Sequence, residues 1–328
     1  MNIYKSIIRP LLFSLPPEMS HSIVENLLFY SPSNITKTLF RNQVNSLLEI
    51  EIFGQKFSSP VGLAAGLDKN CKTSQHYLNM GFGFSVVGTV MKHPRLGNKK
   101  PRLLRLNNEE ALINSLAFPS EGSGVIFNRI NKLQSIKNKL IVSVSGILED
   151  EILYNVEYFK GQCFGFEINI SSPNTNDLSL LVNQVSIKSL SEKVRRITDD
   201  PIFFKLPRFE DLNLYRDLVG TMESFPKIGV VLTNSLPVDD KRLKVGRGGK
   251  SGRPLFEDTL NILRAVRKEF PEIPIISCGG INSAEDVFTL LESGATAIQL
   301  YTSLIFNGPF IANKINSKLL SIIKTVKE

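Results

Sequence analysis

Short apolar runs alternate with helical patterns from about residue 48 onward. Eight of these runs have the length of buried strands, and they cover residues 61–64, 84–88, 140–144, 165–170, 202–205, 228–232, 273–277 and 296–300. Amphipathic segments lie between most of them, for example at 212–225, 259–270 and 284–293. Runs that are apolar throughout and alternate with helices are typical of parallel strands buried on both faces. Eight such units predict an α/β protein with the (β/α)₈ TIM-barrel fold.

Residues 1–45 show a different pattern, with apolar residues at helical spacing on either side of Pro16-Pro17. The two stripes consist of Ile3, Tyr4, Ile7, Ile8, Leu11 and Leu12, and of Met19, Ile23, Val24, Leu27 and Leu28. Two short amphipathic helices with basic flanks can pack on a core or lie on a membrane surface. We therefore expect a short N-terminal helical extension at 1–45 and a barrel at 46–328, with both roles of the extension open.

Two connections are longer than a barrel requires. Residues 89–120 contain two strand-like pieces, 103–106 and 111–113, whereas residues 235–255 have an irregular pattern. Long loops in a compact domain are usually binding loops or lids. We expect both connections to contribute to a binding site.

Composition narrows the class of protein without choosing a function. The 328 residues are 42% hydrophobic and 21% charged, which suits a large packed core. The net charge of +8 favours an acidic partner such as nucleic acid, anionic lipid or an anionic substrate. No apolar stretch reaches the ~20 residues that cross a bilayer. Three cysteines and three histidines, none in metal-binding spacing, predict neither a disulfide framework nor a metal site.

Small, polar or cationic residues follow every predicted strand. In order along the chain they are Gly66-Leu67-Asp68-Lys69, Thr89, Ser143 with Ser145, Asn169 through Thr175, Lys205, Thr233-Asn234-Ser235, Gly279-Gly280 and Tyr301-Thr302. The C-terminal ends of barrel strands meet at one face, where barrel enzymes carry out catalysis. The convergence of these side chains predicts a polar ligand site at that face.

Glycines lie where a ligand phosphate is expected. Gly279-Gly280 follows the seventh strand and leads into a helix, and the loops after strands seven and eight are the usual phosphate site of barrels. Backbone N–H groups at a helix start bind anions. Gly66 and the glycines of 246–252 also allow a ligand to approach the backbone closely. Simple tight turns are the alternative explanation.

Lys69 and Lys205 lie at strand ends, where an inward-pointing lysine is costly unless it meets an anion. A flavin N1–C2=O edge, which becomes anionic on reduction, is a suitable partner, and an ion pair with Asp68 is the alternative for Lys69.

No histidine lies near the strand ends, so Ser172 is the best proton acceptor. Serine is a weak base, so it needs a relay partner and an acidic substrate proton.

Together these motifs resemble those of the dihydroorotate dehydrogenases. The resemblance runs in order over nearly the whole chain. It rests on Leu63-Ala64-Ala65-Gly66-Leu67-Asp68-Lys69, Gly81-Phe82-Gly83 with Val87-Gly88-Thr89, Lys100-Pro101-Arg102-Leu103-Leu104-Arg105-Leu106, Ile168-Asn169-Ile170-Ser171-Ser172-Pro173-Asn174-Thr175, Gly248-Gly249-Lys250-Ser251-Gly252-Arg253-Pro254-Leu255 and Gln299-Leu300-Tyr301. The helical extension, and Ser172 rather than Cys, resemble the class 2, quinone-dependent branch.

The resemblance implies FMN-dependent oxidation of (S)-dihydroorotate to orotate in de novo pyrimidine (UMP) biosynthesis, with a membrane quinone as electron acceptor. FMN would be held by Ala65, Gly66, Lys69, Thr89, Ser143, Asn169, Lys205, Thr233, Gly252, Gly280, Tyr301 and Thr302. The substrate would be lined by Lys69, Asn114, Ser115, Leu116, Ala117, Phe118, Asn169, Asn174, Asn234 and Ser235. The cofactor carries the redox chemistry, and the protein supplies position and electrostatics.

The resemblance also implies a catalytic set and a membrane location. Ser172 would take the C5 proton while the C6 hydride passes to flavin N5, with Thr175 and Lys205 completing the catalytic set. His21 and Arg105 would lie near a quinone tunnel formed by the two N-terminal helices. Residues 1–45 would attach the protein peripherally to the cytoplasmic face of the inner or cell membrane. No nucleic acid and no obligate protein partner are implied.

Two places depart from the pattern of the family. Asn114-Ser115-Leu116-Ala117-Phe118-Pro119-Ser120 stands where class 2 members usually have Asn-Arg-x-Gly-Phe-Asn, so that Ala117 replaces Gly. Ser143 stands where Asn is usual, and its shorter side chain predicts a weaker contact with FMN. These changes leave open a related FMN barrel that acts on a different dihydropyrimidine or on an enone-like substrate.

Two rivals belong to other classes of protein. An RNA-binding flavoprotein of the dihydrouridine synthase type suits the charge of +8. Such an enzyme requires a catalytic Cys, whereas this chain has Ser172 at that place. It also requires a basic RNA-binding domain after the barrel. A catalytically silent FMN-binding membrane protein would hold a flavin that dihydroorotate cannot reduce.

Overall fold

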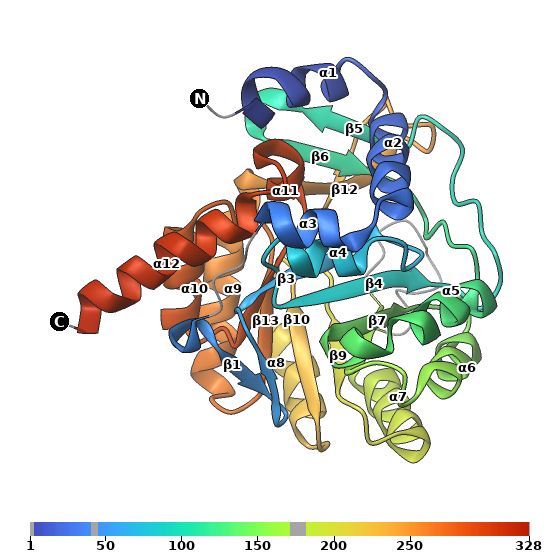
Figure 1. Ribbon diagram of the computed structural model, residues 1–328. Helices are drawn as coiled ribbons and strands as arrows, with labels where there is room; N and C mark the ends of the chain where they lie inside the picture. Colours follow the sequence, from blue (N-terminus) through green and yellow to red (C-terminus); the bar gives the residue numbers. More distant parts are fainter. Residues whose placement is uncertain (1–2, 41–44, 171–181, 328) are drawn as a thin grey trace.

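Eight parallel strands close into a barrel, which confirms the predicted (β/α)₈ fold (Figure 1). The computed structural model describes residues 3–40, 45–170 and 182–327. The barrel strands are β3 (Val61–Asp68), β4 (Phe84–Val90), β7 (Leu140–Val144), β8 (Gly165–Asn169), β9 (Ile202–Lys205), β10 (Ile228–Leu232), β13 (Ile275–Cys278) and β14 (Ala297–Leu300). Pairing of β14 with β3 and of β10 with β13 completes the circle. Each predicted strand is present, with ends that differ by a few residues.

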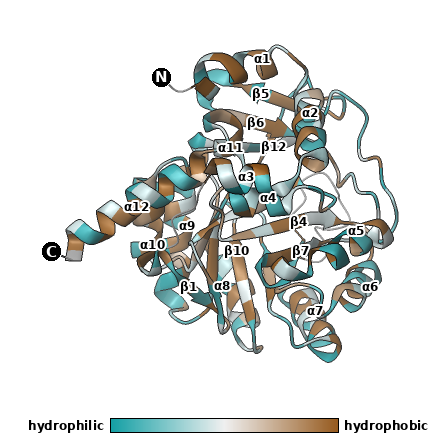
Figure 2. Cartoon of the chain, viewed as in Figure 1, coloured by the Kyte–Doolittle hydropathy of each residue, from teal (hydrophilic) through white to brown (hydrophobic). Residues whose placement is uncertain are grey.

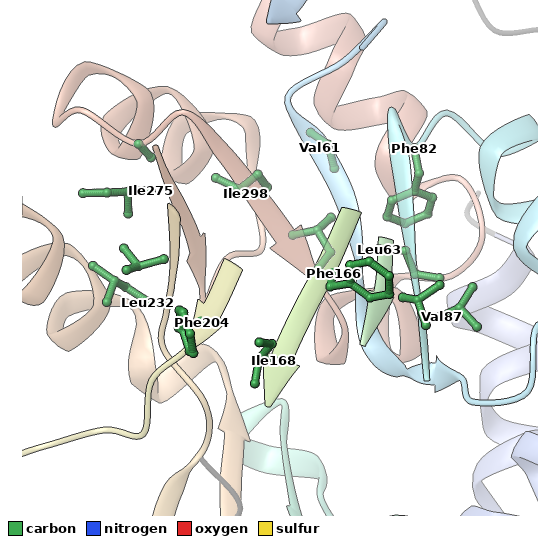
Figure 3. Packing of buried hydrophobic residues seen from close by; sticks show 14 of the residues in the cluster. Val61, Leu63, Phe82, Val87, Phe166, Ile168, Phe204, Leu232, Ile275 and Ile298 are labelled. Carbon is green, nitrogen blue, oxygen red and sulfur yellow. The ribbon is translucent and has the colours of Figure 1, made fainter. Parts of the chain in front are cut away.

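Helices surround the barrel and bury their apolar stripes against its outer surface (Figure 1). They are α4 (Ser74–Asn79), α5 (Ser123–Ile130), α6 (Glu149–Phe159), α7 (Gln184–Ile197), α8 (Leu212–Glu223), α9 (Phe256–Glu269), α10 (Ala284–Glu292), α11 (Thr302–Asn307) and α12 (Ile311–Lys327). A 3₁₀ segment, Asn131–Lys139, links α5 to β7. Figure 3 shows side chains of this layer, among them Val61, Phe166 and Ile298, along the barrel strands.

A hairpin closes the N-terminal end of the barrel. It consists of β1 (Ile50–Ile52) and β2 (Gln55–Phe57), which pair antiparallel. Its Phe57 packs edge-to-face on Phe84 and Phe164, with ring centroids 5.6 and 5.0 Å apart. These residues belong to an apolar cluster with Val231 and Ile276, which fills this half of the barrel interior. Polar side chains of the interior therefore lie toward the C-terminal half.

A separate antiparallel sheet lies over the C-terminal end of the barrel. Its strands, in order across the sheet, are β11 (Leu236–Asp239), β12 (Arg247–Gly252), β6 (Ala111–Asn114) and β5 (Leu103–Leu106). The expectation of an irregular stretch at 235–255 was wrong, because it forms β11 and β12. The glycines of β12 permit close strand pairing, since a Cβ on Gly248 would lie 2.6 Å from the carbonyl oxygen of Asn114.

The N-terminal extension is helical, as predicted, and it lies over β5 and β6 (Figure 1). A π-helical segment (Tyr4–Ile8) continues into α1 (Arg9–Phe13), followed by α2 (Pro17–Tyr30) and α3 (Ser33–Phe40). The prediction of two helices missed α3, whose sequence has few apolar residues.

Many apolar side chains of these helices are exposed, including Leu11, Leu27 and Leu39, and α1 is mostly hydrophobic (Figure 2). Among the helices in the described ranges, none has the length and hydropathy to span a bilayer.

Candidate active site

A cavity of about 170 Å³ lies at the C-terminal end of the barrel, between the strand ends and the antiparallel sheet. Its wall contains residues from most of the barrel strands and from the long connections. They are Ala64, Ala65, Gly66, Lys69, Thr89, Leu103, Leu112, Asn114, Leu116, Ala117, Phe118, Pro119, Asn169, Lys205, Thr233, Asn234, Ser235, Ser251, Leu255, Cys278, Gly279 and Tyr301. Strand ends from all around the barrel thus converge on one site, as barrel topology requires.

Most of the predicted site residues meet at this cavity. Of the expected FMN residues, Ala65, Gly66, Lys69, Thr89, Asn169, Lys205, Thr233 and Tyr301 line it. Of the expected substrate residues, Lys69, Asn114, Leu116, Ala117, Phe118, Asn169, Asn234 and Ser235 line it. Ser115, Ser143, Gly252, Gly280 and Thr302 are not part of its wall. Ser172, Asn174 and Thr175 lie outside the described residues.

A buried polar network lies at the cavity floor, and its central residue, Glu167, was missed by the sequence analysis. Glu167 on β8 is fully buried. Its Oε1 accepts a hydrogen bond from Ser143 Oγ at 3.0 Å, and its Oε2 accepts one from Gln299 Nε2 at 3.0 Å. Ser143, at the position where the family usually has Asn, therefore donates its hydrogen bond to a carboxylate below the cavity and does not line the cavity.

Lys205 on β9 points into the same network. Its Nζ lies 3.8 Å from Glu167 Oε1, and the side chain is 6% exposed. Burial, the largest single influence, would lower the pKa of Lys205, but the Glu167 carboxylate and Cys278 together raise the pKa above its ordinary value. Lys205 is therefore held as a cation at the cavity wall.

Lys69 has a different environment. Burial lowers its pKa, and within the described residues no carboxylate lies within ion-pair distance of it. The alternative of an ion pair with Asp68 is wrong, because Asp68 accepts hydrogen bonds from the backbone N–H groups of Lys72 and Thr73 and from Ser74 Oγ. A ligand anion would therefore supply the charge that Lys69 lacks.

The loop from Asn114 to Ser120 forms one side of the cavity and is fixed by its backbone. Asn98 Nδ2 donates to the carbonyl of Ser115, and the Asn98 N–H donates to that of Leu116. Ala117 and Phe118 adopt left-handed conformations, with φ of 55° and 56°. Glycine takes this conformation most readily, so Ala117 keeps the backbone shape that Gly would favour at this position.

The phosphate end of the expected FMN site has the required backbone and charge. Gly279 and Gly280 have φ of 132° and 78°, and a Cβ on Gly280 would lie 2.2 Å from the backbone nitrogen of Phe256 at the start of α9. Arg208, which the sequence analysis missed, is buried beside Gly279. Its Nη2 donates to Thr259 Oγ1 at 2.9 Å, whereas its Nε has no hydrogen-bond partner among the described residues. The residues present fit a phosphate-bearing cofactor.

A second, larger cavity of about 650 Å³ lies between the N-terminal helices and the top of the barrel. His21 and Arg105, the two expected quinone residues, both line it. Six residues line both cavities, namely Lys69, Leu103, Leu112, Leu116, Pro119 and Tyr301. The two cavities are therefore separated by a wall that is a single layer of residues.

His21 is neutral in this cavity wall. Its Nε2 lies 3.8 Å from Glu25 Oε1, but Glu25 also pairs with the ammonium group of Lys72 at 3.3 Å. Burial, together with the charges of Lys69 and Lys72, lowers the pKa of His21 to about 3. Apolar side chains form most of the cavity wall, and its charged side chains are those of Glu18, Glu25, Lys69, Arg102 and Arg105.

Arg105 connects the two elements that enclose this cavity. It donates from Nη1 to the carbonyl of Leu15 at 2.7 Å and from Nη2 to Ser20 Oγ at 2.8 Å. Its guanidinium carbon lies 4.5 Å from the ring centre of Phe13. A strand residue of β5 therefore holds the turn between α1 and α2.

Comparison with known proteins agrees with this geometry. The family model for dihydroorotate dehydrogenase matches residues 47–323. The chain belongs to the dihydroorotate dehydrogenase family. A protein of Christiangramia forsetii named dihydroorotate dehydrogenase (quinone) is 34% identical, over 97% of this chain and 99% of its own length. A mitochondrial protein of the same name from Oryza sativa is 32% identical over 85% of this chain and 69% of its own length.

Solved structures of the dihydroorotate dehydrogenase family share the whole architecture. The crystal structure of the Eimeria tenella enzyme in complex with ferulenol has a TM-score of 0.84 and 27% identity, and it covers 97% of this chain and 96% of the other. The ligand-free form of that protein has a TM-score of 0.85 and 28% identity, over 94% and 96% of the two chains.

Proposed function

We propose that this chain oxidises (S)-dihydroorotate to orotate with FMN and passes the electrons to a quinone, in de novo pyrimidine (UMP) biosynthesis. The observation that carries this proposal is the pair of cavities with a common wall. The smaller is lined by Lys205 and by amide and hydroxyl side chains, the other is larger and more apolar, and Lys69 lies in the wall between them. An anionic substrate suits the first, an apolar acceptor suits the second, and membership of the family supports both assignments.

FMN, when bound, supplies the acceptor for the hydride that leaves C6 of the substrate. Ala65, Gly66, Thr89, Asn169, Thr233 and Tyr301 would surround it, and Gly252, Gly280 and Thr302 would act from behind the cavity wall. Gly279 and Arg208 support binding of its phosphate, because the glycine lets the backbone approach and the arginine carries positive charge. Ser143 would act on FMN indirectly, through Thr89. The Oγ1 of Thr89 lies 3.1 Å from the Oγ of Ser143.

The substrate would be held by cations and amides on the opposite side of the same cavity. Lys69 would pair with the carboxylate of dihydroorotate, and Asn114, Asn234 and Ser235 would contact its polar edges. Residues Leu116 to Phe118 would exclude water from the reacting carbons. Ser172 would accept the C5 proton, with Thr175 and Lys205 completing the catalytic set.

We assign residues 1–45 to quinone access and membrane attachment, and residues 46–328 to the catalytic barrel. The exposed apolar side chains of the N-terminal helices support attachment to a bilayer surface. Their basic residues, Lys5 and Arg9, suit anionic lipid headgroups. We propose that the protein is peripheral on the cytoplasmic face of the membrane, without an obligate protein partner.

The proposal is tested by substrate and acceptor together. The purified holoenzyme is incubated with dihydroorotate and a soluble ubiquinone analogue, and orotate is measured, with NAD⁺ as the acceptor in a parallel reaction. Orotate that depends on the quinone is expected. Turnover of dihydrouracil or a cyclic enone, but not of dihydroorotate, would instead support a related FMN barrel with a different substrate. The structural reason to test these compounds is the methyl group of Ala117 in the cavity wall.

A further inference from the structure

The polar side chains beneath the active-site cavity converge on one carboxylate. Glu167 is fully buried and is approached from three other strands. Ser143 on β7 and Gln299 on β14 each donate to one of its oxygens at 3.0 Å, and Lys205 Nζ on β9 lies 3.8 Å away. Hydrogen bonds to a carboxylate from donors on both sides, with an ammonium group nearby, hold that side chain in a fixed position.

The hydrogen bonds of this network have a defined direction. The amide N–H of Asn169 donates to Thr89 Oγ1 at 3.2 Å. Because Ser143 Oγ donates to Glu167, it accepts from the hydroxyl of Thr89, which lies 3.1 Å away. Glu167 therefore terminates a chain of donors that begins at Asn169. Two members of that chain, Asn169 and Thr89, line the cavity, so a buried residue orients groups that face the ligand.

Charge is the second consequence. Without Glu167, Lys205 would be a buried cation with no carboxylate within ion-pair distance among the described residues. With Glu167, the cation persists, but much of its field is offset by a negative charge a few ångströms away. A group that gains negative charge near Lys205 is therefore stabilised less than it would be by an unpaired lysine.

We propose that Glu167 is a positioning residue that orients Lys205, Ser143 and Thr89 beneath the cofactor and lowers the reduction potential of bound FMN. The inference rests on the proposed function for the identity of the cofactor. It assigns a role to a residue that does not touch the cavity, and it explains how a chain with Ser143 keeps an ordered polar floor.

The test is the midpoint potential of bound FMN, measured at pH 6.5 by chemical reduction with reference dyes. Glu167→Gln keeps the shape and removes the charge, whereas Lys205→Met removes the cation. The double variant removes both charges. Glu167→Asp retains the charge, and Glu157→Gln is the matched control, because Glu157 is exposed and pairs only with Lys160 among the described residues.

We expect the midpoint potential of FMN to be highest in Glu167→Gln and lowest in Lys205→Met. The parent and the double variant should have similar potentials between these two. Glu167→Gln should favour reduced over oxidised FMN by about tenfold relative to the parent, which is ~30 mV for a two-electron couple. Glu167→Asp and Glu157→Gln should stay near the parental value. If Glu167→Gln folds poorly, the effect of the Glu167 charge is still measured by comparing the double variant with Lys205→Met, and the double variant should have the higher potential.

Two results would overturn the proposal. One is an unchanged potential in Glu167→Gln that retains FMN, and the other is an equal shift in Glu167→Asp, which would indicate a packing effect alone. Chemical reduction needs no dihydroorotate, so the potentials can be measured even if that substrate is not oxidised. Failure of the substrate to reduce the flavin would count against the proposed function instead.

Discussion

Arg105 offers a way to separate the two half-reactions of the proposed enzyme. The guanidinium group holds the turn between α1 and α2 by hydrogen bonds to the carbonyls of Phe13 and Leu15 and to Ser20 Oγ. It does not line the smaller cavity. We therefore expect Arg105→Ala to impair the quinone reaction and to leave the oxidation of dihydroorotate nearly unchanged.

The size of the effect follows from the contacts that are lost. A hydrogen bond from a charged donor contributes about 1.5–3 kcal/mol, and stacking of the cation on Phe13 contributes about 0.5–1 kcal/mol. Arg105 is only partly buried, and one bond is long at 3.3 Å, so we take about 3 kcal/mol for the whole group. If all of it is lost from the quinone-binding geometry, the rate of that step falls by about 100-fold.

Stopped-flow absorbance measures each half-reaction alone. Bleaching of the flavin by dihydroorotate without oxygen reports the first, and recovery of absorbance on mixing with a ubiquinone analogue reports the second. Arg242→Ala is the matched control, because Arg242 is exposed and pairs with Asp240 in a surface loop. The reasoning would be refuted if both half-reactions slowed equally, or if the quinone step were unaffected by Arg105→Ala.

Three further predictions concern the cofactor site, pH and stability. Gly252→Ala should abolish retention of FMN, because its methyl group would lie 2.4 Å from a carbonyl oxygen, whereas Gly246→Ala has open space and should retain it, as measured by flavin absorbance per protein. The folded-state pKa of His21 is about 3, so the unfolded chain binds the proton more tightly, and stability is lost as the pH falls from about 6.5 toward 3. The free energy of unfolding in urea should therefore differ less between pH 5 and pH 8 for His21→Gln than for the parent. An equal difference in the two proteins would contradict the lowered pKa of His21. Phe57→Ala should cost about 3–5 kcal/mol of unfolding free energy, seen as a lower melting temperature with unchanged FMN content, since the side chain is 1% exposed at the closed end of the barrel.

The barrel could be predicted from the sequence because its strands are local, continuous apolar runs. The same runs placed Lys69 and Lys205 at one face, since a parallel barrel brings all its strand ends together. The two strands at 236–239 and 247–252 could not be predicted in this way. The first pairs only with the second, and the second joins the sheet through β6, which is distant in sequence. The glycines that permit close pairing of the second strand resemble those of a loop.

Glu167 was missed because it lies within the apolar run Phe166-Glu167-Ile168, which predicts only a strand. A signal was present, since a glutamate inside a fully buried strand is rare unless it is paired. The role of Ser143 depends on the same contact. Its shorter side chain predicted a weaker contact with FMN, whereas the structure directs its hydroxyl to a carboxylate on the neighbouring strand. Such coupling depends on register between strands, which the pattern of one sequence does not specify.

In the proposed mechanism, one site accepts electrons from dihydroorotate and passes them to a quinone across a single wall of residues. The most direct measurement is the visible spectrum of the purified protein after anaerobic addition of dihydroorotate, followed by a ubiquinone analogue. We expect the flavin bands to bleach with the first addition and to return with the second, with one orotate formed per flavin bleached. A flavin that dihydroorotate does not bleach, or that bleaches but is not reoxidised by the quinone, would contradict it.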